Sequence, residues 1–282
     1  MPIDPLLLDL LADPVDHTPL GWDGRANLLN EGRAVTYPVL DGVPALVGDD
    51  RSSAALADAG HQVRSFDGVA DWYDAVMQDP DAHGAMTRRA NELLAARLVG
   101  VTGVVLDVAC GTGLSPRWLS SDRYRLGGVD ISADQLRLAR SRLPVVQGDA
   151  GALPFRDGVF DAVVTAYSAA PDLEAAAGEA FRVLRDGGRY VQVTVHPVLN
   201  GSWSSVEPDG SVRVASGYNQ RTGVSPALPP TTIRGRVGSV HVPFDAQLRI
   251  PAAAGFRLHE LEEFGEYATG LPSSVVTTWL KS

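Results

Sequence analysis

A glycine turn with a nearby acid is the segment with the clearest chemical meaning. Residues 104–113 read Val-Val-Leu-Asp-Val-Ala-Cys-Gly-Thr-Gly, an apolar run that contains Asp107 and ends in Gly111 and Gly113. The apolar run predicts a central parallel strand, buried on both faces. The glycines permit a tight turn and close approach of a ligand, and a helix beginning near Leu114 would offer its free N–H groups. The segment predicts a nucleotide-type pocket at the carboxyl end of a strand.

The spacing of the turn disfavours NAD as the ligand. A dinucleotide fingerprint requires a third glycine three residues after Gly113, and that position is Pro116. Asp107 lies four residues before Gly111, where a carboxylate could accept hydrogen bonds from the turn or lie near a cationic ligand.

A second acid follows at a distance typical of ribose binding. Residues 124–130 predict a second strand that ends in Asp130, 19 residues after Gly111, where a carboxylate can hold both ribose hydroxyls. Asp130 could also be the acid that begins the next helix, but Ser132 is the better candidate for that cap. A short third strand ends in Asp149, and residues 160–164 predict a fourth strand with Ala166 and Tyr167 at its mouth.

A turn at residues 183–188 and a fifth strand at 189–195 follow. In the order of these segments, the chain resembles the class I S-adenosylmethionine-dependent methyltransferases. Asp186 departs from the family pattern, in which proline is usual. The resemblance implies an α/β, Rossmann-like fold: a seven-stranded, mostly parallel sheet with helices on both faces. It also implies an S-adenosylmethionine-dependent methyltransferase. Residues 243–254 then predict a helix, and 256–264 and 274–280 the last two strands.

The resemblance assigns a cofactor role to residues at the matching positions. It makes Asp130 the ribose clamp, places Ile131 and Gln135 around the adenine, and brings Asp149 to the adenine amino group. The full set of implied cofactor-binding residues is Tyr73, Asp107, Ala109, Gly111, Thr112, Gly113, Asp130, Ile131, Gln135, Asp149, Ala150 and Ala166.

Residues 66–98 have a helical pattern that precedes the glycine turn. Val69, Trp72, Tyr73, Val76 and Met77 form one apolar stripe. In the family such a helix covers the cofactor, and a tyrosine in the position of Tyr73 often reaches it. The alternative is that the stripe, Trp72 above all, is simply core.

An irregular, glycine- and proline-rich insertion at about 197–240 follows the fifth strand. Its position beside the transferable methyl predicts a substrate cover, with a hairpin around residues 211–214. Tyr167, Trp203 and Tyr218 are the candidates for the substrate wall. Methyl transfer to a protonated nucleophile needs a base, and His196 and His241 are the candidates at this edge of the sheet. The alternative is that both are loop or helix-cap residues.

Residues 1–50 predict a small N-terminal α+β module, residues 48–64 a linker, and residues 65–282 the methyltransferase domain. The module is similar to the zinc-ribbon-like activator of tRNA and rRNA methyltransferases, but Asp13 and Asp16 stand where metal-binding versions have a Cys-Pro-x-Cys pair. A structural zinc site needs four ligands, preferably thiolates, and no second pair is visible. We therefore expect no metal, and a module that persists as a packing and dimerisation element.

Composition narrows the function further. The net charge is −10, the basic residues are almost all arginine, and no basic run stands out, which disfavours nucleic acid as substrate. The sequence has no apolar run of about 20 residues and no signal peptide pattern, which predicts a soluble, cytoplasmic protein. The single cysteine, Cys110, is expected to be a small buried residue.

These observations favour methyl transfer to an O, N or C atom of a small molecule, in specialised metabolism. Three alternatives stay open: an rRNA or tRNA methyltransferase, a non-methylating catalyst of the cyclase or pericyclase type that keeps the cofactor, and a binding module without catalysis.

Overall fold

The fold is built on one large sheet. The computed structural model describes residues 3–47, 66–79, 85–119, 121–168, 170, 172–199, 203–219, 233–238, 240–266 and 270–282. The sheet has seven strands in the order β12-β13-β9-β8-β5-β6-β7, and only β13 runs antiparallel to its neighbours. This confirms the predicted Rossmann-like architecture. The strands are β5 (Gly103–Val108), β6 (Tyr124–Asp130), β7 (Val145–Gln147), β8 (Phe160–Ala166), β9 (Leu184–Val195), β12 (Arg257–Glu266) and β13 (Pro272–Leu280).

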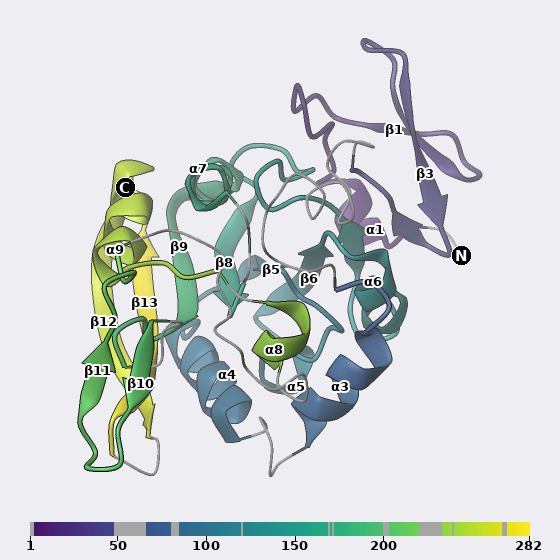
Figure 1. Cartoon of the computed structure of the whole chain (residues 1–282). Helices are drawn as coiled ribbons and strands as arrows, with labels where there is room; N and C mark the ends of the chain where they lie inside the picture. Colours follow the sequence, from purple (N-terminus) through teal and green to yellow (C-terminus); the bar gives the residue numbers. More distant parts are fainter. Residues whose placement is uncertain are drawn as a thin grey trace.

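Helices cover both faces of this sheet (Figure 1). They are α3 (Ala70–Gln78), α4 (Ala85–Arg97), α5 (Pro116–Leu119), α6 (Ala133–Ala139), α7 (Leu173–Val183), α8 (Ile233–Val237) and α9 (Phe244–Ala253). On one face, Leu93 and Leu94 of α4 pack on Val105 and Val191. On the other face, Val183 of α7 joins the cluster that contains the alternate side chains of the same strands. Both faces of the parallel strands are therefore buried, as the continuous apolar run of β5 predicts.

Three predicted elements have different bounds. The helical pattern over 66–98 is divided between α3 and α4, and the described part of α5 is only four residues long. The turn predicted at 183–188 is instead the beginning of β9. Gly187 has a φ of 75° there, its N–H donates to the Lys281 carbonyl, and the Lys281 N–H donates to the Gly188 carbonyl. Lys281, just after β13, thus pairs with the segment at Gly187 and Gly188, which the local sequence predicts to be a turn.

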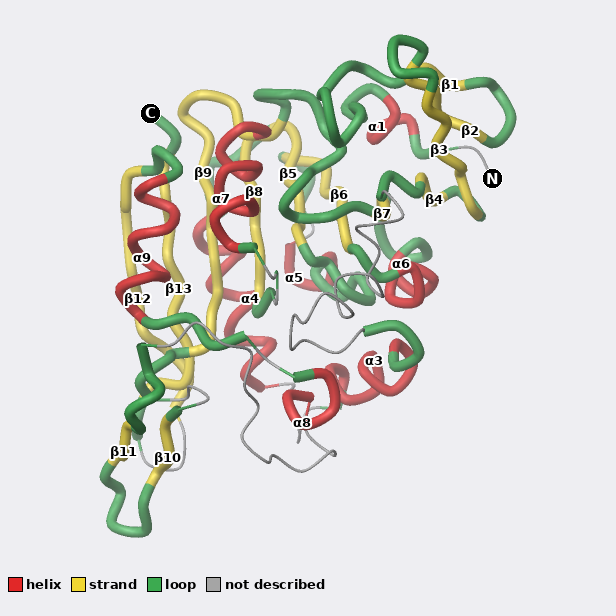
Figure 2. The backbone as a smooth tube through the Cα atoms, turned by 45° about the horizontal axis from the view of Figure 1, so that its top comes forward, coloured by secondary structure: helices red, strands yellow, loops and turns green. Residues whose placement is uncertain are grey.

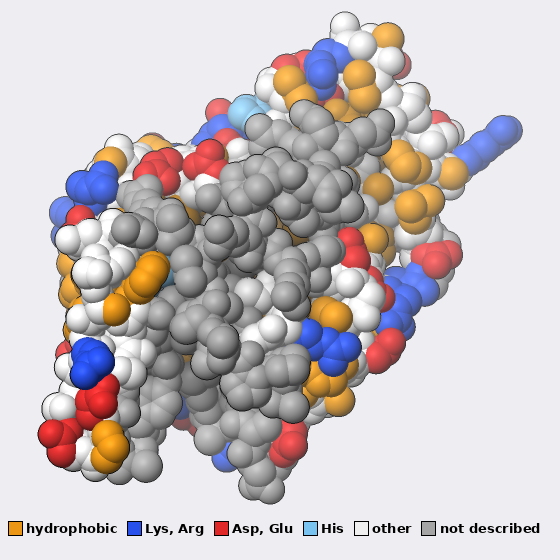
Figure 3. Space-filling model, in the orientation of Figure 1, with side chains coloured by type: hydrophobic (Ala, Val, Ile, Leu, Met, Phe, Trp, Pro, Cys, Tyr) orange, Lys and Arg blue, Asp and Glu red, His pale blue; other side chains and the backbone are white. Residues whose placement is uncertain are grey.

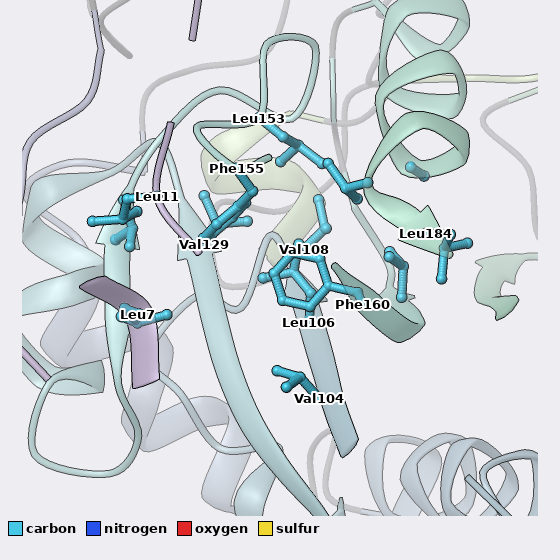
Figure 4. Close-up of a cluster of buried hydrophobic side chains, with 14 of the residues drawn as sticks. Leu7, Leu11, Val104, Leu106, Val108, Val129, Leu153, Phe155, Phe160 and Leu184 are labelled. Atoms are coloured by element: carbon cyan, nitrogen blue, oxygen red, sulfur yellow. The ribbon is translucent and has the colours of Figure 1, made fainter. Parts of the chain in front are cut away.

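The N-terminal module consists of α1 (Pro5–Leu8) and an antiparallel meander of β1 (Gly21–Trp22), β2 (Asn27–Asn30), β3 (Val35–Leu40) and β4 (Val43–Pro44). It docks on the β7 edge, where Ala45 forms a parallel bridge with Gln147. Figure 4 shows Leu7 and Leu11 of the module in the same cluster of side chains as Leu106 and Phe160. The module and the sheet therefore share one core. The linker predicted at 48–64 lies outside the described residues.

A buried carboxylate lies in the turn that precedes β1 of the N-terminal module. Asp13 is fully buried and accepts hydrogen bonds from Asn30 Nδ2 at 2.8 Å, Arg33 Nη1 at 2.7 Å, Tyr37 Oη at 3.0 Å and the Val15 N–H at 2.8 Å. In the described part of the chain, no group of three or more His, Cys, Asp or Glu residues is arranged to hold a metal ion.

The insertion after β9 contains the predicted hairpin, formed by β10 (Ser204–Val206) and β11 (Val212–Val214), and the short helix α8. Figure 2 shows the hairpin beyond the end of β12 and β13, and α8 next to α3. Among the described residues, none of the helices has the length and apolar character needed to cross a membrane.

Candidate cofactor and acceptor site

The glycine turn lies at the carboxyl end of β5. Ala109, Gly111 and Gly113 all have left-handed backbone conformations, with φ values of 60°, 55° and 74°. A Cβ on Gly113 would lie only 2.6 Å from Leu143 and 2.9 Å from Ala139, so close packing of α6 requires glycine there. Cys110 is buried within the turn, as predicted, and burial raises the pKa of its thiol well above the usual range.

Asp130 is the acceptor for the turn. Its Oδ2 accepts the Gly111 N–H at 2.8 Å and its Oδ1 accepts the Ser132 N–H at 2.9 Å. The sequence left open whether Asp107 would take this role, and the hydrogen bond goes to Asp130 instead. Ser132 caps α6, as predicted, since its hydroxyl accepts the Gln135 N–H at 3.3 Å. The carboxylate at the end of β6 is thereby fixed against the turn that follows β5.

Two acids and a tyrosine share this small buried volume. Burial raises the pKa of Asp107 to about 7, a hydrogen bond from Ser115 opposes the shift, and the charge of Asp130 adds to it. Burial also raises the pKa of Tyr73 to about 12, with further contributions from Asp130 and Asp107. The site thus gathers acidic groups whose pKa values are raised by burial, and a positively charged ligand would favour their ionised forms.

Tyr73 covers the turn from α3. Its ring carbon lies 3.8 Å from the position of a Cβ on Gly111, and Phe66 packs edge-on against the same ring, with centroids 5.7 Å apart. The predicted stripe on α3 is half-buried rather than core. The buried residue of this helix is Ala70, which lies outside the stripe. This geometry agrees with a helix that covers a ligand.

The other predicted cofactor residues line the same edge. Gln135 is buried, and its Oε1 has no hydrogen-bond donor among the described residues although it lies 3.7 Å from the Gly111 Cβ position. Asp149 is buried after β7, where its Oδ1 accepts the Gly151 N–H at 2.9 Å. Ile131, Ala150 and Ala166 are half-buried at the ends of their strands, and Thr112 is buried in the turn.

These residues fit S-adenosylmethionine. Each Asp130 oxygen accepts one backbone N–H and retains a lone pair for a ribose hydroxyl. The paired acids suit a ligand with a sulfonium and an ammonium group, and Gln135 Oε1 is an orphaned buried acceptor that a ligand donor would satisfy.

The two candidate bases lie at the two ends of the insertion, His196 after β9 and His241 before α9. Their ring nitrogens have different hydrogen-bond partners. His196 accepts the Leu199 N–H at Nδ1, 3.1 Å, and its Nε2 lies 2.7 Å from Glu263 Oε1. Both nitrogens of His196 are therefore engaged. His241 Nε2 donates to the Tyr218 carbonyl at 2.7 Å, which leaves Nδ1 as the nitrogen without a proton. Burial lowers the pKa of His241, so the neutral form prevails near pH 7.

The predicted substrate-wall residues are divided between two places. Tyr218 lies with the histidines: its hydroxyl accepts the Phe244 N–H at 3.0 Å, and Phe244 stacks on His196 with ring centroids 5.5 Å apart. Trp203 lies beside them, with its ring against Gly217. Tyr167 instead follows β8 with a φ of 54° and bonds Ser274 on β13, with 3.0 Å between the hydroxyl oxygens.

Sequence reasoning missed four partners of these residues: Glu263, Phe244, Ser274 and Arg236. Each lies more than 50 positions from the predicted residue that it contacts, except Phe244, which contacts Tyr218 across 26 positions. No local spacing could have identified them, because strand pairing and helix docking create the contacts.

Comparisons with known proteins agree with this geometry. A family model described as a methyltransferase domain matches residues 105–188. A demethylmenaquinone methyltransferase of Mycolicibacterium gilvum is 39% identical over 163 residues, which are 54% of this chain and 68% of that protein. Another, of Renibacterium salmoninarum, is 32% identical over 169 residues, 57% of this chain and 70% of that protein.

The crystal structure of an S-adenosylmethionine-dependent methyltransferase from Mesorhizobium loti has the same fold. The match has a TM-score of 0.51 at 17% identity and covers 67% of this chain and 97% of that one. With the arrangement of Asp130, the glycine turn and Tyr73 described above and these relatives in sequence, the chain belongs to the class I S-adenosylmethionine-dependent methyltransferase family.

Proposed function

We propose that the protein transfers a methyl group from S-adenosylmethionine to an O, N or C atom of a small molecule, as a cytoplasmic enzyme of specialised metabolism. The observation that carries the proposal is the arrangement in which Asp130 accepts the Gly111 N–H of the glycine turn under the Tyr73 ring. The similar proteins named demethylmenaquinone methyltransferases support a small-molecule acceptor. On the face in Figure 3, the described acidic and basic side chains are interspersed without a continuous basic patch, which disfavours nucleic acid.

We assign the cofactor to the carboxyl ends of β5 to β8. When bound, S-adenosylmethionine supplies an electrophilic methyl group on a sulfonium. Asp130 holds the ribose hydroxyls, while Ile131, Gln135, Asp149 and Ala150 surround the adenine. Asp107 lies beneath the glycine turn, Tyr73 lies above it, and Ala166 lies at the end of β8. The turn itself supplies the remaining contacts, through Ala109, Gly111, Thr112 and Gly113.

We assign His241 to proton removal and His196 to positioning. The neutral His241 ring has an unprotonated Nδ1 and is oriented by the Tyr218 carbonyl, as a general base requires. His196 uses both nitrogens to hold the loop after β9 to β12, so it acts through the shape of the cleft. We also assign Trp203 and Tyr218 to the acceptor wall beside the histidines, and Tyr167 to the same wall at the end of β8.

Incubation with methyl-labelled S-adenosylmethionine tests the function. Candidate acceptors include a reduced naphthoquinone, because of the similar proteins' names, and a panel of phenols and amines. Mass spectrometry is expected to find a labelled small molecule. If the label appeared in RNA instead, the protein would be an RNA methyltransferase and the proposal would be wrong. An unlabelled, isomerised product formed only with cofactor present would replace it by a non-methylating catalyst, and tight cofactor binding without any product would indicate a binding module.

A further inference from the structure

In the described part of the insertion, helix α8 contacts α3, the helix that covers the cofactor site. Figures 1 and 2 both place α8 beside α3. The guanidinium carbon of Arg236 lies 4.3 Å from the centroid of the Trp72 ring, a cation–π geometry. The next residue, Val237, is 1% exposed, so this end of α8 is packed into the protein.

The contact is one residue away from the cofactor site. Trp72 precedes Tyr73 on α3, and Tyr73 is the residue whose ring lies over Gly111. Because consecutive helical side chains point about 100° apart, α3 can present Trp72 to α8 and Tyr73 to the turn. The position of Tyr73 therefore depends on what holds α3 from the outside.

The opposite side of α3 is fastened to α6. Asp134 accepts the Gly68 and Ala70 N–H groups at 2.8 and 3.1 Å at the start of α3. Arg142 makes two hydrogen bonds to Asp74, at 2.5 and 3.0 Å. The helix is thus held between a fixed attachment on α6 and the Arg236 contact from the insertion.

We propose that Arg236 is a positioning residue for the cofactor. Acting through Trp72, it holds Tyr73 over the glycine turn, so the segment that covers the acceptor also retains S-adenosylmethionine and its product S-adenosylhomocysteine. The inference rests on the cofactor site assigned above. It adds that the segment covering the acceptor also helps to hold the cofactor in place.

Calorimetric titration with S-adenosylhomocysteine tests the inference without knowledge of the acceptor. Arg236→Ala and Trp72→Leu are each expected to weaken binding about 3- to 20-fold, the range of a partly desolvated cation–π contact. The double variant is expected to bind no more weakly than the weaker single variant, because both changes remove the same contact. Arg236→Lys and Trp72→Phe retain a cation and a ring, and should restore part of the affinity.

The matched control is Arg249→Ala, which removes an exposed arginine from α9. It is expected to bind like the unaltered protein. Unchanged affinity in Arg236→Ala would overturn the inference. The inference would also be overturned if Arg236→Ala weakened binding of S-adenosylhomocysteine further in the Trp72→Leu variant. The arginine charge would then act directly on the acidic site and not through Trp72. An unaltered protein that fails to bind S-adenosylhomocysteine would instead overturn the cofactor site itself.

Discussion

At the scale of single residues, Asp130 connects the backbone of two strand ends. We expect Asp130→Ala to weaken S-adenosylmethionine and S-adenosylhomocysteine binding about tenfold or more, because hydrogen bonds to a charged group contribute about 1.5–3 kcal/mol each. Calorimetry measures the loss, and Asp209→Asn in the hairpin turn is the control. Equal affinity in the Asp130 variant would remove this residue from the ribose site.

Asp107 gives the ligand-free protein a pH-dependent stability. Its pKa rises from 3.8 to about 7 on folding, so the folded state binds more protons between these values and loses stability as pH rises through them. We expect Asp107→Asn to be more stable than the unaltered protein at pH 8, with a smaller difference at pH 5. Thermal melts at the two pH values check this. A variant that is less stable at pH 8 would contradict the raised pKa of Asp107.

His241 tests the chemistry of the acceptor side. If Nδ1 removes the acceptor proton, His241→Ala should lower kcat about 100-fold or more, since general base catalysis contributes about 10² to 10⁴. Affinity for S-adenosylhomocysteine should stay nearly unchanged. His196→Ala is the comparison, in which a positioning role predicts a raised KM as well. Normal turnover of the His241 variant would leave this histidine with a structural role only.

At the scale of elements, the network around Asp13 holds the N-terminal meander to its first turn. Asp13→Ala leaves Asn30, Arg33 and Tyr37 without their shared acceptor, so we expect a loss of about 2–3 kcal/mol in the free energy of unfolding. Asp16→Ala, at an exposed position of the same turn, should lower the free energy of unfolding by less. Urea unfolding measures both changes.

The same network predicts a module that needs no metal. Chelator should leave the melting temperature unchanged, and elemental analysis should find no stoichiometric zinc. A melting temperature that falls with chelator would contradict this.

At the scale of the whole molecule, module and sheet share one hydrophobic cluster that includes Leu7, Leu11, Leu28 and Leu46. We expect them to unfold in one cooperative step. Hydrogen exchange at increasing urea should remove protection from β2 and β3 at the same denaturant concentration as from β5. Earlier exchange of β2 and β3 would mean that the module is a separate domain, and that residues 65–282 are stable without it.

The sequence alone determined the sheet and its cofactor edge, because those signals are local. Apolar runs, the glycine turn and acids at the strand ends follow one another along the chain, and each parallel strand brings its carboxyl end to the same edge. Ser132 as a cap, the hairpin near residue 211 and the helix after residue 243 were predictable for the same reason. The hydrogen-bond partner of the glycine turn was not predictable, because spacing along the chain does not say whether Asp107 or Asp130 accepts the Gly111 N–H.

Only the tertiary structure decided the contacts between distant segments. It joined His196 Nε2 to Glu263 on β12, brought Tyr167 to Ser274 across the sheet, and placed Arg236 on Trp72. It also packed the N-terminal module against the β7 edge and brought Asn30 and Arg33 to the buried Asp13. Such contacts depend on packing between elements far apart in the chain, and residue type and local spacing carry no information about that packing.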